Sequence, residues 1–245
     1  MLIATMADVA LIFIAFISSC VAGALGMGGG ILLIALMPGL VPVQAIIPVH
    51  AVTQFASNSS RVFFGRSHID YSLIPAFSVG ALLGAWLGGQ VYQDLNLNWL
   101  PGIIGLLILY ITWAPLPKVS GGSNTALVGL GFYQTGLGML VGATGPLGAA
   151  VLRYYNTGRD WLVVNTAVYM SINHALRVVA FGILGFSFAP WLWLILGMVV
   201  AGVLGSWVGT RLRAHIPQQS FQRWFKWLLS LLALRMVALS AQHLF

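Results

Sequence analysis

The sequence predicts an all-helical, multi-pass membrane protein, and three observations lead to that fold class. Of its 245 residues, 59% are hydrophobic and only 6% are charged, whereas a soluble domain carries about 25% charged residues. Eight apolar segments have the ~20-residue scale of a bilayer crossing. The two halves of the chain also resemble each other, and such internal repeats are typical of membrane transporters. We therefore expect two repeats of four helical segments within a lipid bilayer.

The apolar segments and their connections divide the chain. The segments lie at 7–41, 42–65, 71–93, 97–116, 124–152, 161–184, 188–212 and 219–243. Their connections are short except for the stretch PLPKVSGGSN at 115–124. This stretch separates a first repeat at 1–116 from a second repeat at 124–245, with a linker loop at 117–123.

Residues at a nearly constant offset carry the internal repeat. A shift of 116 pairs Gly26 with Gly142, Gly29 with Gly145, and Arg61 with Arg177. Further along the chain the shift becomes 121, and VGALLGAWLGG at 79–89 aligns with VAGVLGSWVGT at 200–210. Glycine and leucine matches are common in apolar sequences, but a paired tryptophan and a paired arginine are more specific.

The basic residues indicate that the second repeat is inverted relative to the first. If segments one and five each enter and leave on the same side, one side receives Arg66, Lys118, Arg153, Arg159, Arg211, Arg213, Arg223 and Lys226. The other side keeps Asp8 and Asp94 and no basic loop residue. The positive-inside rule makes the basic side cytoplasmic. This favours six full crossings, two re-entrant hairpins and both termini outside, whereas eight full crossings would leave basic residues on both sides.

Segments one and five contain glycine-rich breaks, GMGGG at 26–30 and GATGP at 142–146. Unpaired backbone groups in hydrocarbon cost several kcal/mol each and are tolerated only where the backbone is buried in protein or lines a wet cavity. The helix that restarts after each break would direct its N-terminal amides into the protein centre, which favours an anion. Thr144 suits the N-cap position. The alternative interpretation is that these glycines only let helices pack closely. The anion interpretation assigns a central site to Gly26, Gly28, Gly29, Gly30, Thr144 and Gly145.

Segments two and six carry polar residues on one helical face each. In the first half these residues are Gln54, Asn58 and Arg61, and in the second half they are Asn173, His174 and Arg177. Intramembrane ionisable residues usually face the protein interior and mark a pathway, so we expect these six residues to line the path of the anion. Two alternatives stay open: the first arginine could extend to the cytoplasmic interface, and the histidine could be a packing residue rather than a proton relay.

The sequence argues against an enzyme and against nucleic-acid binding. The four carboxylates all lie at loops or segment ends, and no HExxH, GxSxG or Walker motif is present. We expect no metal, no cofactor and no catalytic residue. An intramembrane hydrolase built on Ser171 and His174 is the weaker alternative. The net charge of +7 comes from loop ends, where membrane topology places it, so we expect no nucleic-acid partner.

The stretches GALGMGGGILL at 23–33 and GATGPLGAAVL at 142–152, together with the polar second segment, resemble the TauE/SafE family of sulfite and organosulfonate exporters. That family is also called the toluene-sulfonate uptake permeases. The resemblance covers nearly the whole chain and implies transport of small sulfur-containing or carboxylate anions across a bacterial-type inner membrane. The second break departs from the common pattern, because many members carry another GxGGG element there.

Together these observations predict a secondary transporter that moves a small oxyanion, such as sulfite or a sulfonate, by alternating access. A passive anion channel is the main alternative, because paired half-helices also build pores. The expected partners are the small anion and the lipid bilayer, and the sequence leaves a homodimer open.

Overall fold

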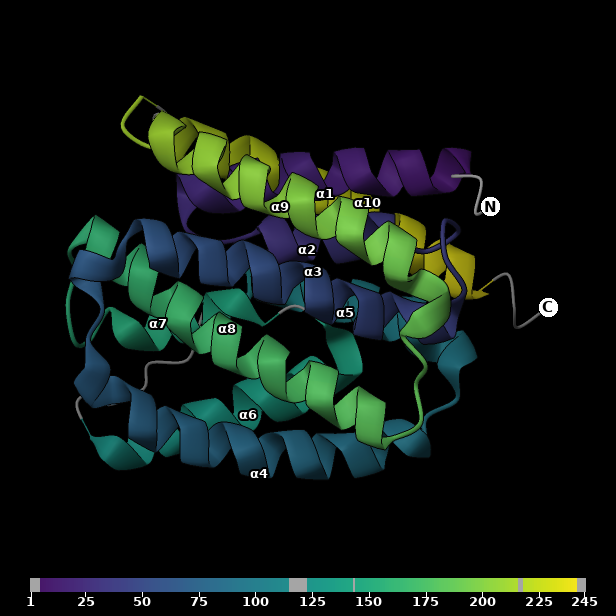
Figure 1. Cartoon of the computed structure of the whole chain (residues 1–245), viewed down its shortest axis with the longest axis horizontal. Helices are drawn as coiled ribbons and strands as arrows, with labels where there is room; N and C mark the ends of the chain where they lie inside the picture. Colours follow the sequence, from purple (N-terminus) through teal and green to yellow (C-terminus); the bar gives the residue numbers. More distant parts are fainter. Residues whose placement is uncertain (1–4, 115–122, 143, 216–217, 242–245) are drawn as a thin grey trace.

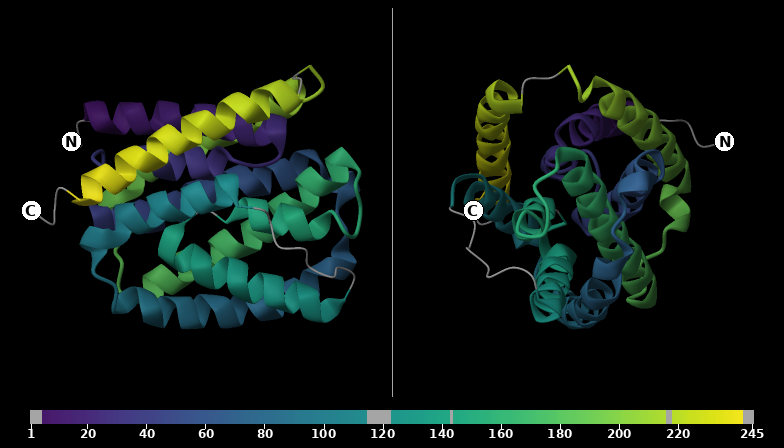
Figure 2. Two further views of the ribbon diagram at one scale, coloured as in Figure 1. Left: turned by 180° about the vertical axis from the view of Figure 1, so that it is seen from behind. Right: turned by 90° about the vertical axis from the view of Figure 1, so that its left-hand side faces the viewer.

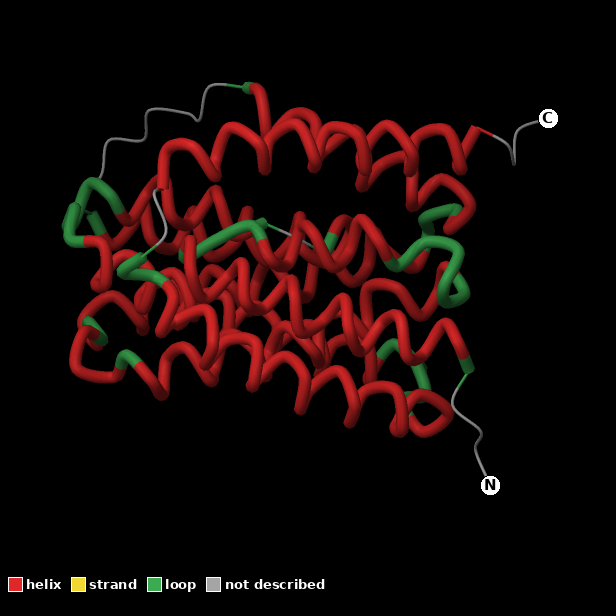
Figure 3. Tube along the Cα trace, turned by 90° about the horizontal axis from the view of Figure 1, so that it is seen from above, coloured by secondary structure: helices red, strands yellow, loops and turns green. Residues whose placement is uncertain are grey.

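The computed structural model describes residues 5–114, 123–142, 144–215 and 218–241. Lys118 and the predicted linker loop, apart from Ser123, lie outside the described residues. Within the described part the chain consists of α-helices joined by turns and short 3-10 helices, without a strand (Figure 3). The all-helical prediction is confirmed.

The ten α-helices of the described residues follow the predicted apolar segments closely. The first half contains α1 (Met6–Leu25), α2 (Gly29–Leu36), α3 (Val43–Phe64), α4 (Ile74–Gln93) and α5 (Leu100–Trp113). The second half contains α6 (Asn124–Val141), α7 (Gly145–Leu152), α8 (Arg159–Ile183), α9 (Leu192–Leu212) and α10 (Gln218–Ala241). Predicted segments one and five thus each hold a long helix followed by a helix of eight residues.

Local sequence signals set the limits of α1. Thr5 and Asp8 form a capping box, in which the Thr5 hydroxyl accepts from the Asp8 amide at 3.1 Å and the Asp8 carboxylate accepts from the Thr5 amide at 2.8 Å. The helix ends where Gly26 takes a left-handed backbone conformation with φ 83°, which glycine adopts without the cost that a β-carbon would add. At a rise of 1.5 Å per residue, α1 is about 30 Å long, close to the thickness of a bilayer core.

Four helical stretches of the described residues are long and apolar enough, by length and composition, to cross a membrane. They are Met6–Leu25, Tyr71–Gln93, Ala189–Leu212 and Arg223–Ala241. The central helices α3 and α8 are of similar length but carry buried polar side chains along one face.

The helices lie side by side along one common direction, with their turns at the two ends of the bundle (Figures 1 and 2). Both termini and the turns at 37–42, 94–96 and 184–188 lie at one end. The turns at 65–73 and 153–158, together with residues 213–215 after α9, lie at the other end. We name it the basic end because these turns contain Arg66, Arg153 and Arg213.

Two helix pairs pack closely enough for their backbones to touch: α4 lies on α6, and α1 lies on α9. A β-carbon built on Gly84 of α4 would lie 2.2 Å from the carbonyl oxygen of Phe132, and one on Gly205 of α9 would lie 2.2 Å from that of Phe16. Only glycine permits these contacts. The helices α3 and α8 pack against each other between the two pairs. The helices α5 and α10 form a further packed pair.

Candidate functional site

A small cavity lies where the breaks after α1 and α6 meet the central helices α3 and α8. Its volume, taken as the space open to the centre of a water-sized sphere, is ≈ 30 Å³. One water molecule needs about 10–15 Å³ on that measure, so the cavity has room for a small ion. Its lining residues are Ala22, Gly26, Met27, Gly28, Gly29, Gly30, Ile31, His50, Gln54, Asn58, Arg61, Gly142, Gly145, Pro146, Thr166, Met170 and His174.

The start of α2 forms one wall of the cavity. Gly28 is its N-cap residue, with φ 93° and no side-chain cap, so the first amides of α2 have no capping acceptor from the protein. Gly29 fits against α1 only because it lacks a side chain, since a β-carbon there would lie 2.0 Å from the Ser18 carbonyl oxygen. Free amides and the positive end of the helix dipole together favour an anion at this wall.

The start of α7 also contributes to the cavity lining, and Thr144 is the N-cap residue of this helix. The Thr144 hydroxyl donates to the Gln134 carbonyl oxygen at 3.1 Å and makes no capping bond to α7. Thr144 is buried and does not line the cavity, whereas Gly145 and Pro146 do. Thr144 thus occupies the predicted N-cap position of α7, but its hydroxyl bonds to a carbonyl of α6 instead of capping the helix.

The face of α3 that turns toward the cavity carries four polar residues. His50 Nε2 lies 2.9 Å from the Gly30 carbonyl oxygen and must donate to it, because a carbonyl only accepts. This leaves His50 Nδ1 buried without a partner, and the side-chain nitrogen of Gln54 is also buried without one. Asn58 donates to the Gln54 carbonyl oxygen at 2.6 Å, and its own oxygen accepts from Arg61.

Arg61 does not extend to the membrane interface. Its side chain is 5% exposed and donates to the Ala22 carbonyl oxygen of α1 at 3.1 Å. A guanidinium at the C-terminal end of a helix interacts favourably with the helix dipole. Arg61 therefore holds the end of α1 against α3 and keeps its charge beside the cavity.

Arg177 makes the corresponding contact in the second half. Its Nη1 donates to the Gly142 carbonyl oxygen at the end of α6 (2.7 Å), to His174 Nδ1 (3.0 Å) and to the Asn173 side-chain oxygen (3.4 Å). Because His174 Nδ1 accepts, the neutral ring carries its proton on Nε2. Arg177 and Asn173 do not line the cavity; they lie behind His174 and fix its orientation. Nε and Nη2 of Arg177 are buried without a partner.

No carboxylate balances the two buried guanidinium groups. The one salt bridge among the described residues joins Arg213 to Asp160 at 2.7 Å, and neither of these lines the cavity. Within the same residues no group of three His, Cys, Asp or Glu side chains could hold a metal ion. The cavity thus has a positive surround and hydrogen-bond donors, a combination that suits an anion.

Sequence reasoning missed His50, Thr166 and Met170, which also line the cavity. His50 lies one helical turn before Gln54 on the same face, and that spacing could have identified it. The offset of 116 pairs His50 with Thr166 and Gln54 with Met170. The offset therefore leads from Gln54 to Met170, and from His50 to Thr166 once His50 is identified by its helical spacing.

Ser171 does not form a hydrolase pair with His174. The Ser171 hydroxyl donates to the Ala167 carbonyl oxygen of its own helix at 2.8 Å and accepts from Ser59 at 3.3 Å. Nδ1 of His174 is taken by Arg177. Within the described residues no hydrogen bond activates this serine as a nucleophile.

The geometry agrees with a comparison against known families. A comparison with curated proteins and with solved structures found no match. Residues 11–236 match the family model described as "Sulfite exporter TauE/SafE". The match spans both halves of the chain and every residue that lines the cavity. This chain therefore belongs to the TauE/SafE sulfite exporter family of membrane transporters.

Proposed function

We propose that this chain is a secondary transporter that moves a small oxyanion across the membrane by alternating access, with sulfite or a sulfonate as the first candidate. The observation that carries the proposal is the central cavity, where Arg61 and Arg177 bring two buried positive charges without a carboxylate. A bacterial-type inner membrane is the proposed location.

The charge argument favours an anion over a neutral solute. A buried charge is costly unless it is paired, and the guanidinium groups here contact only carbonyl and amide oxygens and a histidine nitrogen. An anion in the cavity would supply the missing negative charge. Gly28, Gly29, Gly30 and Gly145 would donate through backbone amides, and Gln54 and His174 through side-chain N–H groups.

The packing supports an inverted repeat. Phe16 and Phe132 differ by 116, and Gly205 and Gly84 differ by 121. The contact of α9 on α1 therefore uses the positions that correspond to those in the contact of α4 on α6. The corresponding helices α3 and α8 run in opposite directions (Figure 1). We propose that α1–α2 and α6–α7 are two glycine-broken hairpins, each beginning and ending on one side of the membrane, that enter from opposite sides and meet at the cavity.

This arrangement suggests how access alternates. Each hairpin is held to its own half by an arginine, Arg61 for α1 and Arg177 for α6. Because α1 packs closely on α9 and α4 packs closely on α6, the bodies that move are these pairs rather than the two sequence halves. A movement of the α1–α9 pair, with α2, relative to the α4–α6 pair, with α7, would open the cavity to one side while closing it to the other.

The decisive test is uptake into liposomes that contain the purified protein, with sulfite, thiosulfate, methanesulfonate, acetate and neutral glycerol as solutes. We expect saturable uptake of at least one anion and none of glycerol. Uptake of glycerol without any anion would overturn the anion site. An ohmic anion conductance that does not saturate would instead identify a channel, the alternative that the cavity alone leaves open.

A further inference from the structure

A second cavity lies between the central cavity and the basic end. Its volume, on the same measure, is ≈ 40 Å³. Its lining residues are Leu25, Gly26, Met27, Ala149, Arg153, Arg159, Leu162, Val163 and Thr166. Three of them, Gly26, Met27 and Thr166, also line the central cavity. The two cavities are therefore adjacent and share part of their walls.

The second cavity has unsatisfied donors of its own. Thr166 is 3% exposed, and its hydroxyl has no hydrogen-bond partner. Arg159 donates through Nη2 to the Ala24 carbonyl oxygen at 3.1 Å, while its buried Nε has no partner. A buried hydroxyl left unpaired normally carries a free-energy penalty, so both groups are positioned for a ligand.

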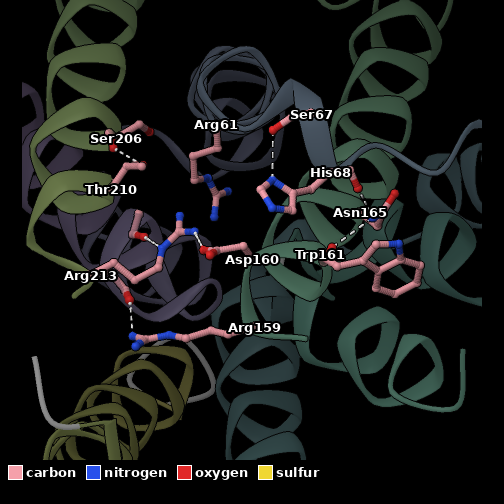
Figure 4. Close-up of polar contacts among 12 residues, drawn as sticks. Arg61, Ser67, His68, Arg159, Asp160, Trp161, Asn165, Ser206, Thr210 and Arg213 are labelled. Carbon is pink, nitrogen blue, oxygen red and sulfur yellow. Dashed lines mark hydrogen bonds and ion pairs between the residues drawn. The ribbon is translucent and has the colours of Figure 1, made fainter. Parts of the chain in front are cut away.

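The carboxylate next to Arg159 in the sequence does not neutralise it. Asp160 accepts from Arg213 Nη1 at 2.7 Å, and Arg213 also donates from Nε to the Gly23 carbonyl oxygen at 3.0 Å. Figure 4 shows Asp160 directed toward Arg213, with Arg159 extended separately below them. The positive charges of Arg153 and Arg159 are thus available to the second cavity, which no carboxylate lines.

We propose that this second cavity is a loading site for the transported oxyanion on the basic side, distinct from the central site. This proposal rests on the proposed function. Arg159 and Arg153 attract the anion at the basic end, and Thr166 contacts it from both cavities, so that the anion passes to the central site without losing a hydroxyl donor.

The loading site has no counterpart at the opposite end. At the offset of 116, Arg153 corresponds to Met37 and Arg159 to Val43, which carry no charge. The central site is shared by both halves, but the basic lining belongs to one half only. The protein should therefore saturate at a lower anion concentration from the basic side than from the other side.

The experiment measures sulfite transport in inside-out and right-side-out membrane vesicles, for the wild type and for Arg159→Gln, Arg159→Lys and Thr166→Val. Loss of one charge-assisted hydrogen bond should raise the half-saturation concentration from the basic side about tenfold relative to the other side in Arg159→Gln. Arg159→Lys should restore part of this difference. Arg66→Gln is the matched control, because Arg66 is exposed at the same end, lies over the Phe63 ring at 5.4 Å and lines neither cavity.

The outcomes separate the two proposals. Thr166→Val removes no protein hydrogen bond, because that hydroxyl has no partner, so it tests the site even where Arg159→Gln does not fold. Wild-type transport with the same ratio between the two sides in every variant would overturn the loading site alone. A change in Arg66→Gln equal to that in Arg159→Gln would also overturn it, because surface charge would then explain the effect. Absence of anion transport by the wild type would overturn the proposed function itself.

Discussion

At the scale of single residues, the cavity gathers polar atoms that the fold leaves unpaired. Buried polar groups are nearly always hydrogen-bonded, and each unsatisfied one costs about 1–3 kcal/mol. Here atoms of His50, Gln54 and Thr166, which line the cavity, and of Arg177, which lies behind His174, are buried without a partner. All four residues belong to α3 or α8. Such a cluster of unpaired polar atoms is expected at a binding site where the ligand supplies the missing hydrogen bonds.

Gln54 offers a direct test of this interpretation. We expect Gln54→Met to leave the melting temperature unchanged or raised, because the side-chain nitrogen that it removes has no partner in the protein. The replacement is also the residue found at the corresponding position of the second half, Met170. Anion affinity should fall about tenfold, the effect of one lost donor to a charged ligand.

Thermal unfolding and sulfite binding, measured on the same purified sample, check the Gln54 prediction. Gln134→Met is the control, since the nitrogen of Gln134 donates to the Thr144 carbonyl oxygen at 3.1 Å and its loss should lower the melting temperature. A Gln54→Met variant that is destabilised but binds sulfite normally would contradict the interpretation.

Arg177 tests the role of geometry apart from charge. Arg177→Lys keeps the positive charge, but the lysine side chain ends one bond short of the position of Nη1, the nitrogen that reaches both Gly142 and His174. We expect the transport rate to fall more than about tenfold, since each lost charge-assisted bond matters to the orientation of His174. Transport assays compare it with Arg235→Lys, where the arginine donates to the Pro38 carbonyl oxygen at 3.2 Å and neither residue lines the cavity. Equal rates in both variants would show that charge alone suffices.

At the scale of helices, the sequence predicted the elements well and the contacts poorly. The segment predicted at 161–184 is the helix Arg159–Ile183, because apolar length and the bilayer fix such limits. The direction of a polar side chain was not predictable, because a threonine or arginine inside a helix can bond to its own helix, to a neighbour or to a ligand. Thr144 bonds to α6, and Arg61 bonds to α1, and neither contact has a signal in the local sequence.

Substitution of the neighbouring Gly29 and Gly30 at the start of α2 distinguishes a role in helix packing from a role in anion binding. Gly29→Ala places a β-carbon 2.0 Å from the Ser18 carbonyl oxygen, so α1 and α2 must move apart at a cost of about 1–3 kcal/mol. Gly30→Ala meets nothing closer than the Gln54 side-chain oxygen at 3.3 Å, but its methyl group occupies the cavity. We expect the first variant to lower the melting temperature and the second to keep it while losing transport. The reverse pattern would show that Gly30 serves helix packing alone.

The close packing of α9 on α1 gives a second prediction at this scale. Gly205→Ala forces a β-carbon to within 2.2 Å of the Phe16 carbonyl oxygen, so the helices must separate and the melting temperature should fall. Gly182→Ala in α8 is the control, because a β-carbon there meets no atom within 4 Å and alanine favours a helix by about 1 kcal/mol over glycine. Thermal unfolding in detergent compares the two. Equal stability of both variants would exclude backbone contact as the basis of this interface.

At the scale of the whole molecule, the two ends of the bundle differ in charge. The turns at the end that holds both termini, 37–42, 94–96 and 184–188, contain no lysine or arginine, whereas the turns of the basic end contain Arg66, Arg153 and Arg213. Short loops rich in lysine and arginine stay on the cytoplasmic side. The basic end should therefore face the cytoplasm, and the loading site should take up the anion from there, which corresponds to export.

Single cysteines at the two ends test this orientation. In a Cys20→Ser background, Arg66→Cys and Asp94→Cys each place one thiol at an exposed position, on opposite ends of the bundle. A charged maleimide that cannot cross the membrane should label Asp94→Cys in cells whose outer membrane is permeabilised and whose inner membrane is intact. It should label Arg66→Cys only after the inner membrane is opened as well. Labelling of both thiols from the same side would be incompatible with a bundle that spans the membrane along its helix direction. Labelling of Arg66→Cys alone from outside would reverse the orientation, and the loading site would then serve uptake.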